Sequence, residues 1–325
     1  MDQPFSYNRQ AVELIEKSVL PRLNELRIEA NALANGTTII DMGVNCLGCW
    51  TAAKYFVLIG LGGRGEVEYG KVLIDGTLIP TVNVYVTQPI ITEMSSHVAY
   101  WNLRYGTTTI VISGPIRAIQ APDMFSQTVS YRDVNPGCGV AMIQTDQIPD
   151  EALTQMIAEQ AGIPADKLYV IVAKTASIVG SVQVPARNVE QTLPSLYDHG
   201  FEVRNIVQAY GISPIVAIVS DEDEAYGRVN DCLLYGQETT LWVDCSDQEI
   251  ESVLPVLTFD KNKDIYGMPF KELFRQCGRS WANVPRDWDA PCKVNFHNIR
   301  TGHSFSIGTI NENVLLNDFK GEVTC

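Results

Sequence analysis

Hydrophobic positions along the chain follow a helical period at first and a strand-like alternation afterwards. An apolar stripe of helical spacing covers the first thirty residues, and Pro21 should bend or split that helix. Short β-rich runs separated by glycines follow at residues 37–42, 71–79, 81–86 and 107–113. The first part of the chain is therefore expected to consist mainly of sheet.

Helices and strands alternate beyond about residue 130. An acidic start at Asp150 and a stop at Gly162 delimit an amphipathic helix, and Pro185 suits the first turn of a helix that stops at Gly200. The other expected elements are strands at 168–173, 201–207 and 239–244, a helix at 221–232, and a hairpin made of 293–298 and 303–307.

This change of pattern predicts an α/β protein with two domains. The first is a sheet-rich α/β domain of residues 1–130, and the second is an α/β domain of residues 131–325. No linker of low complexity marks the boundary, so it is soft, and the hairpin at 293–307 can return to the first domain.

The charge balance decides which partners the chain favours. It has 38 acidic residues against 24 Lys and Arg, a formal net charge of −14. Binding to nucleic acid depends on cations that meet phosphates, and no basic stripe is present, so we expect no nucleic-acid partner. A cationic small molecule is favoured by the same field.

Membrane and redox chemistry are not expected. The longest weakly charged stretch, residues 206–220, is too short to span a bilayer, and the N-terminal residues lack the pattern of a secretory signal. We therefore expect a cytoplasmic protein without a membrane partner. Eight scattered cysteines are expected to be reduced thiols, and the one Cys-x-x-Cys pair, Cys46 and Cys49, cannot close a zinc site.

Residues 60–65, Gly-Leu-Gly-Gly-Arg-Gly, match the glycine spacing of a dinucleotide-binding loop. That loop needs a helix after the glycines, with its N-terminus at the pyrophosphate, and an acidic residue about twenty positions further on. Here a β-like alternation follows at 66–74, and the acid Asp75 comes too early. We therefore expect no nicotinamide or flavin site. Nucleophile elbows and phosphate-binding lysine loops are also absent from the sequence.

The segment 173–190 is the most informative part of the chain. A buried strand leads into a loop rich in small hydroxyl and amide residues, and the following helix carries Arg187 and Glu190. A spacing of three places both side chains on one helical face, and spacing alone favours a surface ion pair worth a few tenths of a kcal/mol. Hydroxyl, amide and free helix N-terminal groups at the end of a strand instead indicate a ligand site.

The same segment resembles the methenyltetrahydromethanopterin cyclohydrolase family. The run Thr-Ala-Ser-Ile-Val-Gly-Ser-Val-Gln at 175–183, followed by Arg187 and Glu190, is the most specific match. Other matching stretches lie in order along nearly the whole chain: 41–45, 113–118, Pro214 in the loop 211–217, 230–231 with 235–236, 267–270 and 300–302.

The resemblance implies a fold, an assembly and a reaction. The fold has two related mixed α/β domains that enclose a deep pterin pocket, and the assembly is a homotrimer without metal or redox cofactor. In the implied reaction, water adds to the cationic N5,N10-methenyl carbon of a tetrahydromethanopterin derivative and gives the N5-formyl product. An arginine and a glutamate at the positions of Arg187 and Glu190 flank that carbon in the family.

This chemistry suits the two side chains. The methenyl carbon is already electrophilic, so the enzyme has to orient water and accept its proton, and Glu190 is the expected general base. Arg187 is expected to lower the pKa of that carboxylate, to hold it in place and to stabilise the developing negative charge on the attacking oxygen. We expect ten further residues to bind substrate: Asn45, His97, Val98, Trp101, Ser113, Arg117, Gln144, Ser177, Ser181 and Gln183.

Three positions depart from the family pattern. Val98 stands where archaeal members carry a lysine, Gln144 stands where the family has a pocket glutamate, and Lys174 replaces a proline. Gln144 can hydrogen-bond but cannot exchange a proton. Two alternatives to the cyclohydrolase therefore stay open: a divergent paralogue that opens or closes a different small heterocycle, and a non-catalytic pterin-binding protein.

Overall fold

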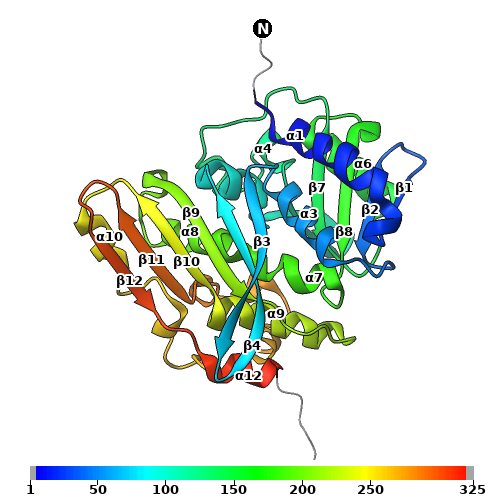
Figure 1. Ribbon diagram of the computed structural model, residues 1–325. Helices are drawn as coiled ribbons and strands as arrows, with labels where there is room; N and C mark the ends of the chain where they lie inside the picture. The colour runs from blue at the N-terminus through cyan, green and yellow to red at the C-terminus, as the bar shows by residue number, and fades with distance from the viewer. Residues whose placement is uncertain (1–4, 320–325) are drawn as a thin grey trace, which may run out of the picture. The chain divides into compact units, whose positions relative to one another are not determined.

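Two six-stranded mixed sheets form the framework of the computed structural model, which describes residues 5–319 (Figure 1). Contacts divide the chain into two units. The first contains the residues up to Glu66 together with Ile91–Gln183, and the second contains Val67–Ile90 together with the residues from Val184 onward. Each unit combines one sheet with helices, which confirms the α/β class.

The sheet of the first unit has the strand order β1-β2-β8-β7-β6-β5. Its strands are β1 (Glu29–Ala32), β2 (Thr38–Gly43), β5 (Trp101–Tyr105), β6 (Thr108–Ser113), β7 (Gly139–Gln144) and β8 (Leu168–Ala173). The central strands β2, β8 and β7 are parallel, and the outer pairings are antiparallel. Consecutive side chains of β8 are buried almost without exception, as expected for a strand that is covered on both faces.

The helices of the first unit cover this sheet. They are α1 (Tyr7–Leu14), α2 (Leu23–Leu26), α3 (Trp50–Gly60), α4 (Arg117–Gln120), α5 (Met124–Gln127), α6 (Glu151–Ala161) and α7 (Ile178–Gln183), with π-helical turns at Ile15–Val19 and Ile90–His97 and 3-10 turns at Leu20–Arg22 and Ala165–Lys167. The N-terminal helical stretch changes to a 3-10 turn at Pro21, which confirms the predicted split. The Asp150 side chain caps α6 and Gly162 ends it in the left-handed region, again as predicted.

The glycine-rich residues 60–65 form a turn between a helix and a strand. Helix α3 ends at Gly60, Gly62 and Gly63 adopt φ angles of +60° and +71°, and β3 (Gly65–Ile74) follows directly. Since β3 is a strand, no helix N-terminus faces these glycines from the C-terminal side. The β-like alternation predicted directly after these glycines is confirmed by β3.

The sheet of the second unit has the strand order β12-β11-β10-β9-β4-β3. In addition to β3 it contains β4 (Thr77–Val86), β9 (Ile206–Pro214), β10 (Glu238–Val243), β11 (Lys293–Asn298) and β12 (Ser304–Gly308). Strands β10 and β11 pair in parallel, whereas β9 pairs antiparallel with both β10 and β4, and β11 and β12 form the predicted antiparallel hairpin. Through β11 the hairpin joins the sheet of the second unit.

The second unit also contains the helices that bear on function. They are α8 (Asn188–Asp198), α9 (Glu222–Gly236), α10 (Asp247–Val253), α11 (Phe270–Gln276) and α12 (Glu312–Phe319), with 3-10 turns at Pro185–Arg187, Val203–Asn205, Phe259–Lys261, Trp281–Asn283 and Arg286–Trp288. Helix α8 contacts β9 and β10. Among the residues 5–319, no helix has the length and the apolar run that a bilayer crossing requires.

Two expected strands were wrong in their extent. The run at 71–79 is broken by a turn, where Asp75 and Gly76 adopt positive φ angles between β3 and β4. The strand expected at 201–207 begins only at Ile206, because residues 203–205 form a 3-10 turn whose Arg204 N–H is bonded by the Glu202 side chain. A local side-chain hydrogen bond competes there with the β-propensity of the valine.

The division into units does not coincide with the boundary expected near residue 130. The chain passes from one unit to the other at residues 66–67, 90–91 and 183–184. Strands β3 and β4 precede most of the first unit in sequence but belong to the second sheet, where β4 pairs with β9. Hydrophobic patterning indicates that a strand exists but not which sheet it joins.

Helix α12 lies beside α9, and each contributes a buried carboxyl group (Figure 1). Asp231 of α9 accepts a hydrogen bond from the Phe270 N–H at 2.8 Å, and burial raises its pKa well above the usual value. Oδ2 of Asp318 on α12 is buried without a hydrogen-bond partner in the described structure. Burial raises the pKa of Asp318 to about 7, while Arg228 opposes the shift.

We expect stability to fall as pH rises from about 4 to about 7, because the folded chain keeps a proton on Asp318 that the unfolded chain has lost. Asp318→Asn should flatten this slope, part of which remains through Asp231, and should make the protein more stable than wild type at pH 8. Urea unfolding at several pH values measures the effect. Asp264→Asn, at an exposed position, is the control. A variant with an unchanged slope would contradict the assignment.

Candidate functional site

Arg187 and Glu190 lie at the start of α8 in the second unit. Arg187 ends the 3-10 turn that begins at Pro185, and Glu190 belongs to the first helical turn. The helix runs from Pro185 through Glu190 towards Gly200, as predicted. Pro185 fits here because the first turn of a helix does not need its missing N–H.

The two side chains form a shielded ion pair. Arg187 Nη1 is 3.7 Å from Glu190 Oε1, and the side chains are only 12% and 14% exposed. A surface pair of the same spacing, Glu272 and Arg275 on α11, is 40% and 64% exposed. Spacing alone favoured a surface ion pair, and this interpretation is wrong for Arg187 and Glu190. Partial removal from water strengthens the interaction of the pair with any charged group that enters.

Asn188, between the two residues, fixes the start of α8. Its backbone carbonyl oxygen accepts hydrogen bonds from Gln237 Nε2 at 3.0 Å and from the hydroxyls of Thr192 and Thr239 at 2.9 and 3.0 Å. The side chain of Asn188 is fully buried against Gly211 of β9, where an added Cβ would lie 2.0 Å from Asn188 Oδ1. The close approach of β9 therefore requires glycine at position 211.

Further polar groups of the second unit surround Arg187. Gln191 of α8 donates from Nε2 to Asp289 Oδ1 at 3.0 Å. Burial raises the pKa of Asp289, whereas the hydrogen bond from Gln191 and the positive charges of Arg286 and Arg187 lower it. Tyr226 of α9 experiences the charges of both Asp289 and Arg187, and burial raises its pKa to about 12. Arg187 and Asp289 thus both act electrostatically on Tyr226, and Gln191 is hydrogen-bonded to Asp289.

The predicted residues of the first unit include a group at the carboxyl edge of its three parallel strands. Gln144 ends β7, where Nε2 donates to Thr175 Oγ1 at 2.5 Å and Oε1 accepts from Gln183 Nε2 at 2.8 Å. Asn45 follows β2 in a turn whose N–H groups bond the Asp41 carboxylate, and its side chain is exposed. This edge is where open α/β sheets place ligands.

Ser177 and Ser181 shape the start of α7 and are buried. Ser177 Oγ donates to the Lys174 carbonyl at 2.7 Å and accepts from the Gly180 N–H at 2.9 Å, while Ser181 Oγ donates to the Ile178 carbonyl at 2.9 Å. The bond from the Gly180 N–H is that of a helix cap, since Ser177 directly precedes α7. Both hydroxyls thus hold the loop that carries Thr175 and leads to Gln183.

Four other predicted residues are buried in the first unit. His97 is bonded through Nδ1 to Glu93 Oε2 at 2.9 Å, and both side chains are 2% exposed or less. Val98 is equally buried, and Trp101 belongs to the hydrophobic core. Ser113 ends β6, and its hydroxyl donates to the Met142 carbonyl at 3.5 Å. Trp101 therefore packs in the core, which is the more common location of an aromatic side chain.

Arg117 is a buried structural cation. Its guanidinium makes two hydrogen bonds to the Asp123 carboxylate, at 2.8 and 2.6 Å, and two more to the carbonyls of Ser96 and Met94. The side chain is fully buried. These bonds join the π-helical segment at Ile90–His97 to α4 and α5. The bidentate pair with Asp123 adds geometric specificity to this link.

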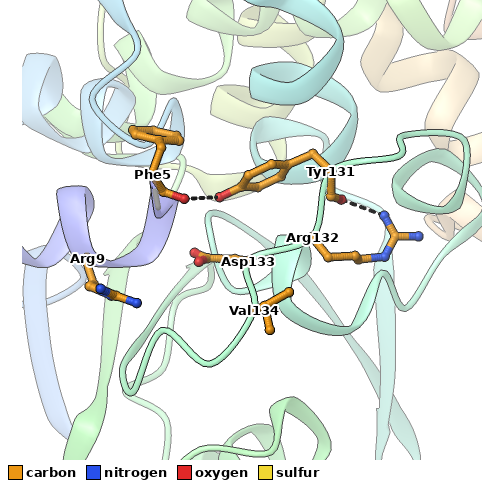
Figure 2. A pocket seen from close by; sticks show the side chains of 6 residues that line it. All are labelled: Phe5, Arg9, Tyr131, Arg132, Asp133 and Val134. Atoms are coloured by element: carbon orange, nitrogen blue, oxygen red, sulfur yellow. Dashed lines mark hydrogen bonds between the residues drawn. The ribbon is translucent and has the colours of Figure 1, made fainter. Parts of the chain in front are cut away.

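A cavity of about 350 Å³ in the first unit is lined by none of the predicted site residues. Figure 2 shows the Tyr131 hydroxyl directed at the Phe5 carbonyl, and the Arg132 guanidinium turned back to the carbonyl of Tyr131. The other lining residues are Arg9, Asp133 and Val134. Asp133 is held by the hydroxyl of Ser6 and by the backbone and amide N–H groups of Asn8, which secures the N-terminus of α1.

Cys46 and Cys49, the one Cys-x-x-Cys pair, lie just before α3. Within residues 5–319, His, Cys, Asp and Glu side chains do not gather in a group of three that could hold a metal ion. Burial raises the pKa of Cys46 to about 11, which is opposite to the shift of a reactive thiol. Cys49 Sγ instead caps α3 by accepting from the Ala52 N–H at 3.3 Å.

Sequence reasoning missed Gln191, Asp289 and Glu93. The spacing of four between Glu93 and His97 would indicate their contact if the segment had been recognised as helical. Gln191 follows Glu190 directly, but Asp289 lies 98 positions away and no local pattern connects them.

Comparison with known proteins shows similarity along almost the whole chain. A family model described as Cyclohydrolase (MCH) matches residues 6–319. The methenyltetrahydromethanopterin cyclohydrolase of Methanococcoides burtonii is 31% identical over 317 residues, which cover 97% of this chain and 98% of that protein. The proteins of the same name from Methanococcus maripaludis strain C7 and Methanocaldococcus jannaschii are 32% and 31% identical, and the alignments cover 97% and 96% of this chain and 98% and 97% of those proteins.

We expect Arg117→Met to lower the free energy of unfolding by about 3–5 kcal/mol, because the Asp123 carboxylate would stay buried without its partner. Urea denaturation measures this loss. Arg104→Met, at an exposed position on β5, is the control and should change stability by less than about 0.5 kcal/mol. Near-wild-type stability combined with weakened substrate binding would instead assign Arg117 to the ligand site.

Proposed function

The chain belongs to the cyclohydrolase (MCH) family, and from this premise we propose that it catalyses the reversible hydrolysis of an N5,N10-methenyl tetrahydromethanopterin to the N5-formyl compound. The observation that carries the proposal is the shielded Arg187–Glu190 pair at the start of α8. The family match supports the reaction, and the geometry supplies the two groups that the reaction needs.

The reaction is a water addition followed by ring opening. Glu190 accepts a proton from water as the oxygen bonds to the methenyl carbon, which loses its positive charge. The bond from this carbon to N10 then breaks, N10 takes up a proton from Glu190, and the hydroxyl proton leaves as the formyl oxygen forms. One proton is released in total. General-base help of this kind contributes typically 10²–10⁴-fold to the rate.

Arg187 assists in two ways. Its charge, 3.7 Å from Glu190, favours the ionised carboxylate that can act as a base. It also stabilises negative charge that develops on the attacking oxygen. A cationic substrate would be repelled by Arg187 alone, but Glu190 offsets that charge locally, and the net charge of −14 attracts the substrate at long range.

From the family resemblance we further propose a substrate-binding role for the polar sheet edge of the first unit. Gln144, Gln183, Ser177, Ser181 and Asn45 offer or support hydrogen-bonding groups at the ends of parallel strands. The bonds that Gln144 makes to Thr175 and Gln183 show that an amide fits this network without a charge. We assign His97, Val98, Trp101, Ser113 and Arg117 to the support of this edge, because they are buried within the unit.

We also propose that the protein works in the cytoplasm as a homotrimer and needs neither a metal nor a redox cofactor. The family resemblance supports the trimer, and seven free thiols among the described cysteines suit a reducing compartment.

Glu190→Gln should lower kcat by about 10²–10⁴-fold and leave substrate affinity within a few-fold, because the amide keeps the shape but cannot accept a proton. Decay of the methenyl absorbance measures turnover, with and without a chelator. The matched control is Glu272→Gln, which alters an exposed glutamate of the same spacing to an arginine. No acceleration by wild-type protein would refute the proposed reaction, and full activity of Glu190→Gln would refute the role of Glu190 as base.

For the assembly, we expect light scattering on purified protein to give three times the mass of one chain, independent of concentration in the micromolar range. A mass equal to one or two chains would contradict the proposed trimer.

A further inference from the structure

Gln191 is a buried amide next to the proposed base. It follows Glu190 on α8 and lies four residues after Arg187, so it shares the helix face of the arginine. Its side chain is nearly inaccessible, at 5% exposure. A glutamine in this position loses its contact with water on folding and needs partners for both ends of its amide.

Only one end of the amide has a partner in the described structure. Nε2 donates to Asp289 Oδ1 at 3.0 Å, an arrangement in which the carboxylate of Asp289 accepts the hydrogen bond. Oε1 is buried without a hydrogen-bond partner among the described residues. A buried acceptor left in this state typically costs about 1–3 kcal/mol. This cost is removed if a ligand brings a donor.

The surroundings connect Gln191 with the reaction site. Asp289 and Tyr226 both lie within the electrostatic reach of Arg187, and Asp289 also acts on Tyr226. Tyr226 is hydrogen-bonded to the Trp281 indole, and Trp281 packs against Phe270 and Phe274 at ring-centre distances of 5.5 and 5.7 Å. The buried acceptor therefore belongs to a neighbourhood that combines charged groups with aromatic surface.

We propose that Gln191 is a substrate-binding residue whose Oε1 accepts a hydrogen bond from an N–H group on the edge of the pterin ring, and that Asp289 is a positioning residue that holds the amide in this orientation. The inference rests on the proposed function and names a further contact of the same site. An acceptor suits this ligand because a pterin edge presents amino and ring N–H donors, and recognition by a buried hydrogen bond discriminates strongly against rings that lack the donor.

The two residues have different expected roles in kinetics. Gln191 contacts a part of the substrate remote from the reacting carbon, so its loss weakens substrate and transition state alike and raises KM with little change in kcat. Asp289 acts only through Gln191. Removing Asp289 therefore adds nothing once the amide is gone, which distinguishes positioning from an independent structural contribution.

The test is a double-mutant cycle with methenyltetrahydromethanopterin as the probe. Gln191→Met removes the acceptor at similar side-chain length and should raise KM about tenfold or more, with kcat within about threefold. Asp289→Asn is nearly isosteric and should raise KM less. The double variant should match Gln191→Met alone. Gln276→Met is the matched control, because Gln276 is an exposed glutamine that also bonds a carboxylate, Glu272, at 3.3 Å.

The outcomes separate this inference from the proposed function. If wild-type protein turns over the substrate and Gln191→Met keeps the wild-type KM, the inference is overturned while the proposed function stands. Additive effects of the two substitutions overturn the role of Asp289. If wild-type protein neither binds nor hydrolyses the substrate, both proposals fall. Should Gln191→Met not fold, as judged by circular dichroism, Asp289→Asn decides: an unchanged KM overturns the inference, and a raised KM with unchanged kcat supports it.

Discussion

The backbone carbonyl of Asn188 is the point on which the proposed reaction site depends. It accepts hydrogen bonds from Gln237, Thr192 and Thr239, and these bonds tie the first turn of α8 to β10 and to the segment before it. Arg187, Glu190 and Gln191 all project from this turn, so their positions follow from the anchorage of Asn188. Because general-base catalysis is sensitive to displacements of about an ångström, a rigid attachment of the helix start is itself a functional requirement.

Much of the fold could be predicted from local patterns. Helix α6 was found with both of its ends, because the Asp150 cap and the left-handed Gly162 are local in origin. Strand β8 and the hairpin of β11 and β12 were found because their side chains alternate or are uniformly apolar. Helix α3 was missed, since its long apolar run precedes a group of glycines and shows no polar face. The partition into units could not be predicted, because strand pairing between β4 and β9 depends on tertiary contacts.

The candidate site shows the same limit. Arg187 and Glu190 were identified from a spacing of three and from the family resemblance, and the structure adds that the pair is shielded from water. Arg117 lies in a conspicuous polar motif but makes four hydrogen bonds within its own unit, which sequence cannot reveal. The partnership of Gln191 and Asp289 joins α8 to a loop far along the chain. Contacts between residues so far apart in sequence arise only in the folded chain, and they produce no periodic pattern of residues from which they could be predicted.

Because β3 and β4 come early in the chain, they are synthesised well before the strand that pairs with β4. During synthesis these strands leave the ribosome before the whole of β7, β8 and α8, whereas the partner of β4, strand β9, ends only at Pro214. The edge of β4 that later pairs with β9 therefore stays unpaired until most of the polypeptide has emerged, and unpaired edges are templates for association with other chains. A fragment that stops short of Pro214 keeps that edge open, so heterologous expression should favour the uninterrupted chain over any dissection between the two sheets.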